Sequence, residues 1–195
     1  MQNILEIAES NQKRAFEVIK DSGVIEAWQS IGAEINLIGS LKMGLLMTHR
    51  DIDFHIYTPQ LNLSESFAAI ARLAENPRIC RVSYNNMLNE EDACLEWHAW
   101  YLDLQNQEWQ IDMMHIVKGS KYDGWFEKVA QRIGEVITPE QRQTILELKH
   151  QTPEDVKIMG IEYYQAVIRD GVKTFAGFMQ WRQKHPADTI IEWLP

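Results

Sequence analysis

The 195-residue sequence predicts an α+β fold, with a mixed β-sheet and flanking helices followed by a helical C-terminal subdomain. Apolar runs and period-two alternation between residues 35 and 117 are typical of strands. Helical signals fill the first 21 residues and return from Tyr122 onward. No repeat or long Gly/Ser/Pro linker divides the chain. We therefore predict a core at 1–120 and a helical subdomain at 121–195, joined by a shared core or a tight interface.

The elements of the first part follow from local signals. Asn62 and Ser64 mark a helix start, and Asn76-Pro77 stops that helix. Residues 105–108 are polar and suit a hairpin connection between two strand-like runs. The predicted order is a helix at 3–21, a strand at 35–38, a short helix at 40–46, a strand at 51–57, a helix at 64–75, and strands at 79–84, 96–104 and 109–117.

The second part carries helix punctuation and many aromatic residues. Thr138 to Gln141 has the pattern of a cap and first turn, and Thr152 to Asp155 offers another. Asp170-Gly171 is a stop signal. Aromatic residues at helical spacing, such as Phe175, Phe178 and Trp181, predict core packing.

Composition indicates a protein of the cytoplasm. No segment approaches the roughly eighteen apolar residues of a membrane helix, and the first residues lack the core of a signal peptide. Cys80 and Cys94 have no CxxC spacing, so we expect reduced thiols. We therefore expect a cytoplasmic protein with no membrane partner.

The segment from Ile35 to Ser40 predicts a phosphate site. Ile35, Leu37 and Ile38 form an apolar run that suits a buried strand, and Gly39 ends it in a tight turn. If a helix begins next, Ser40 is its N-cap, and the free N–H groups of the first turn can bind an anion.

The next strand predicts a metal site. Residues 51–57 alternate with period two, so Asp51, Asp53 and His55 share one face. Two neighbouring carboxylates repel each other unless a cation lies between them, and hard oxygen ligands suit Mg²⁺ or Mn²⁺. A phosphate anchor beside metal ligands predicts phosphoryl chemistry.

Gly39-Ser40, ten intervening residues and then Asp51-Ile52-Asp53 resemble the nucleotidyltransferase superfamily typified by DNA polymerase beta. The resemblance covers about the first 120 positions. The superfamily has a third carboxylate on a later strand, for which Asp112 is the best candidate and Asp103 the rival. Asp112 is favoured because it stands alone between apolar neighbours, whereas Asp103 adjoins a polar loop.

The resemblance implies a role for each of these residues. Asp51, Asp53 and Asp112 would hold two divalent ions, with Asp112 facing the attacking oxygen as a ligand or as the base. Gly39 and Ser40 would hold the β and γ phosphates of an NTP such as ATP. An acceptor hydroxyl would attack the α-phosphorus and release pyrophosphate. A final pair of basic residues, Lys42 and Arg50, are candidates for touching phosphate.

The charge distribution predicts the class of acceptor. The net charge is −9, and residues 1–120 hold 17 Asp/Glu against 9 Lys/Arg, with no basic cluster. A polyanion such as RNA needs a basic surface, so nucleic acid is an unlikely acceptor and a small neutral or cationic molecule fits better. Aminoglycoside- and lincosamide-modifying members of the superfamily are similar in size and acidity. No pattern selects one acceptor, one base or one oligomeric state.

Two other interpretations stay open. The same transfer could act on tRNA or a protein, as in toxin-type relatives, or the domain could sense nucleotide without turnover. Intact Gly39, Ser40, Asp51 and Asp53 favour an enzyme over a sensor. For His55, His98 and His115, and for the tryptophans near Asp112, we expect ordinary structural roles.

Overall fold

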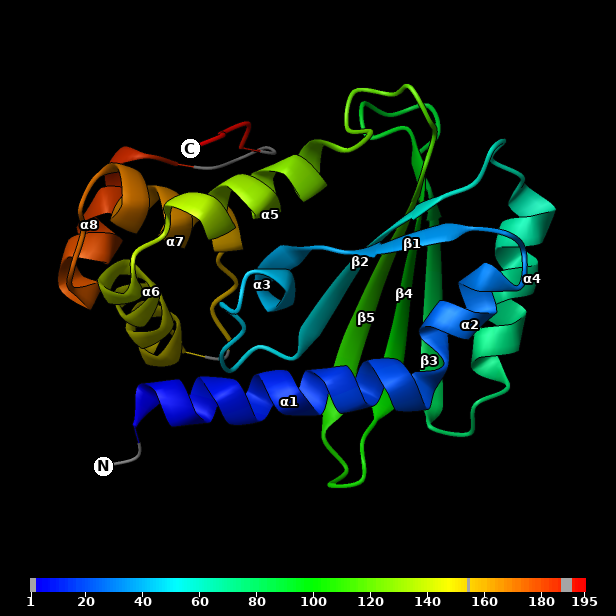
Figure 1. Ribbon diagram of the computed structural model, residues 1–195, viewed down its shortest axis with the longest axis horizontal. Helices are drawn as coiled ribbons and strands as arrows, with labels where there is room; N and C mark the ends of the chain where they lie inside the picture. The colour runs from blue at the N-terminus through cyan, green and yellow to red at the C-terminus, as the bar shows by residue number, and fades with distance from the viewer. Residues whose placement is uncertain (1–2, 154, 187–190) are drawn as a thin grey trace.

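The computed structural model describes residues 3–153, 155–186 and 191–195, and its centre is a five-stranded sheet in the order β1-β2-β5-β4-β3 (Figure 1). Strands β2 and β5 pair in parallel and every other neighbouring pair is antiparallel. The predicted mixed sheet is therefore confirmed. The strands are β1 Glu34–Leu37, β2 Asp51–Tyr57, β3 Ile79–Asn86, β4 Cys94–Leu102 and β5 Glu108–Ile116.

The strand register arranges polar side chains in rows across one face of the sheet. Asp53 on β2 pairs with Asp112 on β5. The same row continues through His98 on β4 to Ser83 on β3. Residues paired across neighbouring strands project to the same face. Two parallel rows flank this one: Asp51, Gln110, Trp100 and Arg81 on one side, and His55, Met114, Glu96 and Asn85 on the other.

Three helices cover the opposite face: α1 Ile4–Ser22, α2 Val24–Gln29 and α4 Leu63–Ala74. The residues of β2 that alternate with the polar ones, such as Phe54, belong to the same buried cluster as the fully buried Trp28 of α2. Burying apolar side chains on one face fixes which side chains face the other. We call these the packed face and the open face of the sheet.

The C-terminal part contains α5 Trp125–Val136, α6 Pro139–Gln151, α7 Gly160–Tyr164, a π-helical turn at Gln165–Arg169 and α8 Phe175–Lys184. Its aromatic side chains pack as predicted, with Phe178 stacked against Tyr163 and Trp181. The capping box predicted at Thr138 and Gln141 starts α6. The predicted stop at Asp170 also holds, since the π-helical turn ends at Arg169.

The two parts touch through α1 and the segment after β1. Helix α1 runs along both parts in Figure 1, and Ala8 at its start packs with Met47 and with Leu146 of α6. Leu45 belongs to the C-terminal apolar cluster although it lies early in the sequence. The boundary at residue 120 stays a prediction.

Several sequence-based boundaries differ from the structure. The expected helix at 40–46 is a single turn, α3 Gly39–Lys42, and α2 was not predicted. No helix begins at Thr152, which instead ends α6, and Glu154 of that predicted cap lies outside the described residues. None of the helices in the described ranges is long and apolar enough to cross a membrane.

Candidate functional site

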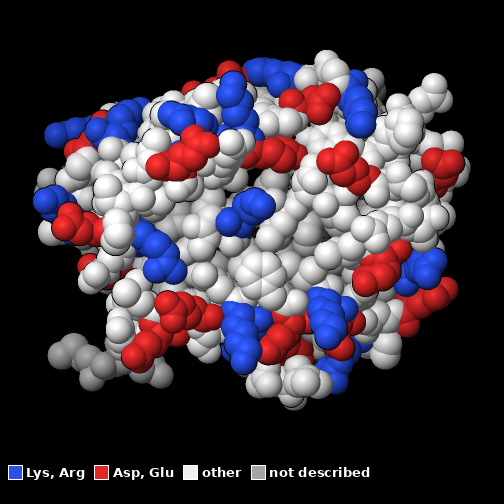
Figure 2. Space-filling model, viewed as in Figure 1, with Lys and Arg blue, Asp and Glu red and all other residues white. Residues whose placement is uncertain are grey.

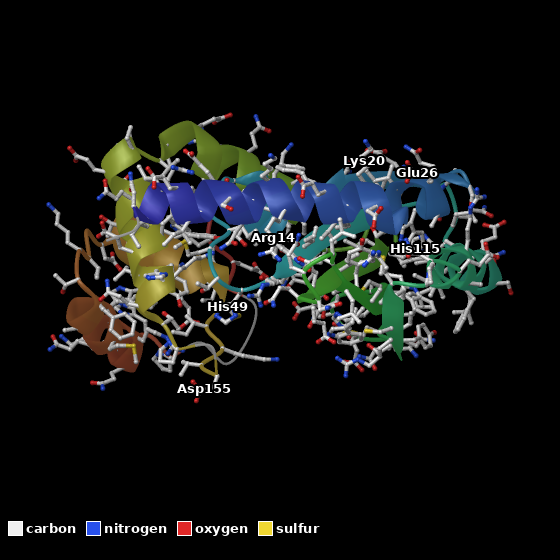
Figure 3. The ribbon with its side chains drawn as sticks, turned by 90° about the horizontal axis from the view of Figure 1, so that it is seen from below. Arg14, Lys20, Glu26, His49, His115 and Asp155 are labelled. Atoms are coloured by element: carbon white, nitrogen blue, oxygen red, sulfur yellow. The ribbon has the colours of Figure 1, made fainter. Side chains whose placement is uncertain are left out.

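A cavity of about 930 Å³ lies between the open face of the sheet and the C-terminal helices. A volume of this order suits a ligand of nucleotide size. His49, one of its lining residues, lies between the sheet and these helices in Figure 3. Six of the seven predicted site residues line the cavity: Gly39, Ser40, Arg50, Asp51, Asp53 and Asp112.

Asp51 and Asp53 project from β2 into the cavity. Within the described ranges, neither side chain has a hydrogen-bond or ion-pair partner. Burial raises the pKa of Asp53 well above its usual value, and the charges of Asp51 and Asp112 raise it further, with Lys149 opposing them. The strand thus holds carboxylates together at an energetic cost that a cation would relieve.

Asp112 lies opposite Asp53 on β5 and is held by a polar network. Its Oδ1 accepts a hydrogen bond from Gln110 Nε2 at 2.8 Å and contacts Nδ1 of His98. The other ring nitrogen of His98 lies 3.4 Å from Glu96 Oε1. The contact with Asp112 raises the pKa of His98, while burial opposes this rise. His98 is therefore placed to fix the orientation of Asp112, a role beyond the one expected from sequence.

Asp103 lies away from the cavity, on the packed face. It pairs with Arg14 of α1, which projects toward the sheet in Figure 3. It also accepts bonds of 2.9 Å from the Trp109 indole and from the amides of Gln105 and Gln107. Although burial raises its pKa, these bonds lower it more, to about 2. Asp103 therefore fixes the β4–β5 hairpin, and the structure brings Asp112 to Asp51 and Asp53 instead.

Position 39 requires a glycine, because the backbone there lies close to the side chain of Asp53. The φ of Gly39 is +66°, and a Cβ placed there would lie 1.9 Å from Asp53 Oδ2. The amide of Ile38 donates to the Asp53 carbonyl at 2.9 Å, which ties the turn to β2. The predicted N-cap role of Ser40 is wrong: α3 begins at Gly39, with Ile38 as its cap. Ser40 is thus within the first turn, whose N–H groups lack partners inside the helix.

The loop between α3 and β2 is held by side chains from distant helices. Asn11 and Gln12 of α1 donate to the carbonyls of Met47, Gly44 and Leu46 at 2.8 to 3.1 Å. Arg142 of α6 donates to the Gly44 carbonyl at 3.2 Å. These bonds satisfy loop carbonyls and fix the spacing between Gly39 and Asp51.

Lys149 is a cavity cation that sequence reasoning missed. Its Nζ donates to the Leu45 carbonyl at 3.0 Å and to Tyr164 Oη at 3.3 Å. Burial lowers the pKa of Lys149 to about 8, against the attraction of Asp51 and Asp53. A signal was present, because Lys149 interrupts the apolar stripe that Ile145 and Leu148 form on α6.

The two basic residues predicted from sequence are separated by the fold. Arg50 lines the cavity, whereas Lys42 is exposed at the end of α3 and is not among the lining residues. The structure therefore does not bring Lys42 to the other predicted site residues. Lys149, with Arg50, provides the positive charge beside Asp51 and Asp53.

The donor set of this cavity fits a hard divalent cation. Carboxylate oxygens suit Mg²⁺ or Mn²⁺, and those of Asp51 and Asp53 are free of protein partners in the described chain. No three His, Cys, Asp or Glu side chains among the described residues are yet close enough to form a metal cage. Asp112 instead contacts Gln110 and His98. Asp51 and Asp53 are thus the residues best placed to hold an ion, with Asp112 beside them.

His55 shares this face but is tied to the C-terminal part. Its Nδ1 lies 3.2 Å from Glu127 Oε2 of α5, and Tyr57 donates to the other Glu127 oxygen at 2.9 Å. The Gly124 amide donates to Tyr57 Oη at 3.1 Å. These contacts join the end of β2 to the start of α5, as the structural role expected for His55 requires.

The sequence matches no protein-family model and no curated protein. Solved structures nevertheless share the fold. The chain aligns with the non-canonical poly(A) polymerase complex GLD-2–GLD-3 at a TM-score of 0.53 and 9% identity, over 86% of this chain and 58% of that one. It aligns with Cid1, a terminal uridylyl transferase, at a TM-score of 0.54 and 12% identity, over 81% of this chain and 46% of that one. With the TRAMP polymerase core, the TM-score is 0.53 and the identity 11%, over 89% of this chain and 59% of that one.

These structures are of poly(A) polymerases and a terminal uridylyl transferase, and they confirm the fold that the resemblance implies. The chain spans about half the length of the structures it matches. At such low identity, the likeness bears on the fold alone.

Proposed function

We propose that this protein is a metal-dependent nucleotidyltransferase that moves a nucleoside monophosphate from an NTP to a hydroxyl of a small molecule. The observation that carries the proposal is the row of paired residues that places Asp112 beside Asp53 in a cavity that also contains Gly39, Ser40 and Lys149. A structure of Cid1, which has the same fold, holds MgGTP. Metal-bound nucleotide is therefore the ligand that this arrangement suits best.

Each residue has a distinct part in the proposed reaction. The amides at Gly39 and Ser40, with Lys149 and Arg50, hold the phosphates of the NTP. A divalent ion, when bound by Asp51 and Asp53, supplies charge stabilisation at the phosphoryl oxygens. Asp112, oriented by its hydrogen bonds, positions the acceptor hydroxyl.

The chemical step exchanges one P–O bond for another. The acceptor oxygen forms a bond to the α-phosphorus, and the bond from the α-phosphorus to its bridging oxygen breaks, which releases pyrophosphate. The hydroxyl proton leaves to Asp112 or to solvent. This step requires the chain to position the reactants and to stabilise charge, and it needs no covalent enzyme intermediate.

A small acceptor is favoured by charge. The chain carries −9, and Figure 2 shows Lys/Arg and Asp/Glu interspersed over the face in view, without a continuous basic stripe. Binding to an RNA backbone draws on clustered positive charge. An RNA acceptor is the second candidate, because the solved structures with this fold include poly(A) and poly(U) polymerases.

The test is incubation with Mg²⁺, each of the four NTPs and a pool of hydroxyl compounds, following pyrophosphate release and acceptor mass. We expect release that depends on both the metal and an acceptor, and that is lost in Asp51→Asn. The matched control is Asp103→Asn, which removes an acid of the same size outside the cavity. Equal release by wild type and Asp51→Asn would refute the mechanism.

A second arm separates the two acceptor classes. A single-stranded RNA oligonucleotide replaces the pool, and products are resolved by length. We expect no extension of the RNA under conditions that modify a small acceptor. Extension by one or more nucleotides would replace the small-molecule proposal with RNA tailing, while keeping the same site.

A further inference from the structure

The C-terminal wall of the cavity carries an ion pair to which the proposed reaction gives no part. Glu162 of α7 and Arg182 of α8 both line the cavity, and Arg182 Nε donates to Glu162 Oε1 at 2.7 Å. Glu162 is buried, and its Oε2 accepts a bond of 2.9 Å from the Met159 amide. Both oxygens of this acid are therefore bonded within the protein, and the acid serves to hold Arg182 in place.

Arg182 keeps donors that the ion pair does not use. Within the described ranges its only hydrogen bond is the one from Nε, so the two terminal amino groups, Nη1 and Nη2, have no protein partner there. The side chain is 27% exposed, which leaves these groups open to a ligand. A guanidinium is planar and Glu162 restrains it, so the two amino groups form a fork with a set direction. Such a fork recognises two acceptor atoms that lie side by side.

The rest of this wall adds a donor and, among the described residues, no further carboxylate. Lys157, in the loop before α7, lines the cavity and is exposed. The hydroxyl of Tyr163 is already bonded to Thr152 at 2.7 Å. Glu162 is the one acid among the described lining residues from Lys157 to the end of α8. The wall therefore presents donors to the cavity, and it suits a ligand edge made of acceptors.

This wall adjoins the proposed phosphate end. Lys149 donates to Tyr164 Oη at 3.3 Å, and Tyr164 lies two residues after Glu162 on α7. Trp125 of α5 also lines the cavity and packs against the apolar cluster that contains Tyr163. The Trp125 ring is half-buried, so part of its surface is left for a planar ligand. An NTP whose phosphates lie at Lys149 is therefore positioned to place its base against this wall.

We propose that Arg182 selects the base of the NTP, and that this base is guanine. The inference rests on the proposed function, because it takes the NTP phosphates to be held at Lys149. Guanine presents O6 and N7 side by side as two acceptors, which match the fork of Arg182. Adenine has an amino donor beside its N7, and uracil and cytosine present a single polar group on the corresponding edge. GTP is therefore the donor nucleotide that this wall suits best.

A series of purine nucleotides tests which atoms are recognised. Binding of GTP, ITP, 7-deaza-GTP and ATP to the wild-type protein is measured by calorimetry with Mg²⁺ and without an acceptor. ITP keeps O6 and N7, so we expect it to bind within about twofold of GTP. 7-Deaza-GTP lacks N7, and ATP has an amino group in place of O6, so each should bind at least about tenfold more weakly than GTP. Affinity for 7-deaza-GTP equal to that for GTP would contradict recognition by the fork.

A conservative variant locates the preference at Arg182. Arg182→Lys keeps a cation beside Glu162 but loses the fork, so the affinity for GTP should fall about tenfold while that for ATP stays unchanged. Unchanged ATP binding also shows that the variant is folded. The matched control is Arg169→Lys, which alters an arginine paired with Asp170 outside the cavity and should leave the preference for GTP intact. A GTP preference that survives in Arg182→Lys, or a loss of ATP binding equal to that of GTP, overturns the inference.

The outcomes separate this inference from the proposed function. The same titrations are repeated on wild-type protein without Mg²⁺, and with UTP and CTP. Metal-dependent binding of NTPs with no preference for GTP, or with a preference for UTP, overturns the inference alone. Absence of metal-dependent binding for every NTP overturns the proposed function, and the inference falls with it.

Discussion

The packed and open faces of one sheet differ in how their polar side chains are satisfied. On the packed face, Asp103 has partners for both carboxylate oxygens, and His115 is bonded by Thr58 and Ser66. On the open face, the side chains of Asp51 and Asp53 have no protein partner in the described ranges. Acids whose hydrogen bonds are complete stabilise a fold, whereas acids left open to a cavity are available to a ligand.

The two kinds of acid differ in the face to which they project, because alternate residues of a strand project to opposite faces of the sheet. Asp103 and Asp112 belong to the same hairpin, yet only Asp112 pairs in register with Asp53. Side chains alternate between faces, so a shift of one residue exchanges the cavity for the packed face. The contrast is therefore testable by removing equivalent groups from each face.

The largest expected effect follows from removing a carboxylate of the open face. Asp53→Asn should lower the proposed nucleotidyl transfer about 10³-fold or more, because one proposed metal ligand and its charge are lost. Pyrophosphate release at saturating Mg²⁺ and NTP measures this loss. Activity within tenfold of wild type would show that the open face is not where the chemistry occurs.

A second prediction concerns the turn that touches Asp53. Gly39→Ala should destabilise the protein by about 3 kcal/mol, since its φ of +66° disfavours Ala and the new Cβ would meet Asp53 Oδ2. The matched control is Gly32→Ala, whose φ is +74° but whose Cβ would meet nothing within 4 Å. That change should cost about 1 kcal/mol. Equal losses in urea unfolding would contradict the close approach.

The third prediction tests the packed face. Asp103→Asn should cost about 2 kcal/mol of unfolding free energy at pH 7, because the native pKa of about 2 lies below the usual 3.8. A depressed carboxyl pKa stabilises the fold above pH 4, and this contribution is lost as pH falls from about 4 to 2. Wild type and variant should therefore converge over that window in urea titrations. A constant difference would contradict the assignment.

The smallest expected effects compare one histidine from each face. His98→Gln should lower kcat about tenfold with little change in the KM for NTP, because Asp112 loses an orienting contact. His115→Gln should leave kcat unchanged and cost about 1 kcal/mol of stability through its bonds to Thr58 and Ser66. Steady-state kinetics and thermal unfolding of both variants decide between the two roles. Identical effects would remove the distinction between the faces.

Much of the open face could be predicted from local sequence. Period-two alternation placed Asp51, Asp53 and His55 together, and the bounds of β2 match the predicted 51–57. The same reasoning favoured Asp112 over Asp103, though only the register puts Asp112 opposite Asp53. Alternation is a property of a single strand, and pairing is a property of the whole chain.

Contributions from distant segments could not be predicted. Lys149 reaches the cavity from α6, where its Nζ donates a hydrogen bond to the Leu45 carbonyl, a contact across 104 positions. The role of His98 depends on the pairing of β4 with β5. The cap lies at Ile38, two residues before the predicted Ser40, because the left-handed backbone of Gly39 lets the helix begin at Gly39 itself. Only the folded chain supplies these facts.

The central proposal is that Asp51 and Asp53 of β2 hold a divalent metal on the open face, beside Asp112 of β5. Its most direct test is anomalous diffraction from crystals grown with Mn²⁺ and a non-hydrolysable NTP analogue. The account predicts manganese peaks in contact with Asp51 and Asp53, beside Asp112, with the triphosphate against Gly39 and Lys149. Manganese elsewhere on the protein, with these carboxylates unliganded at saturating metal and nucleotide, would contradict it.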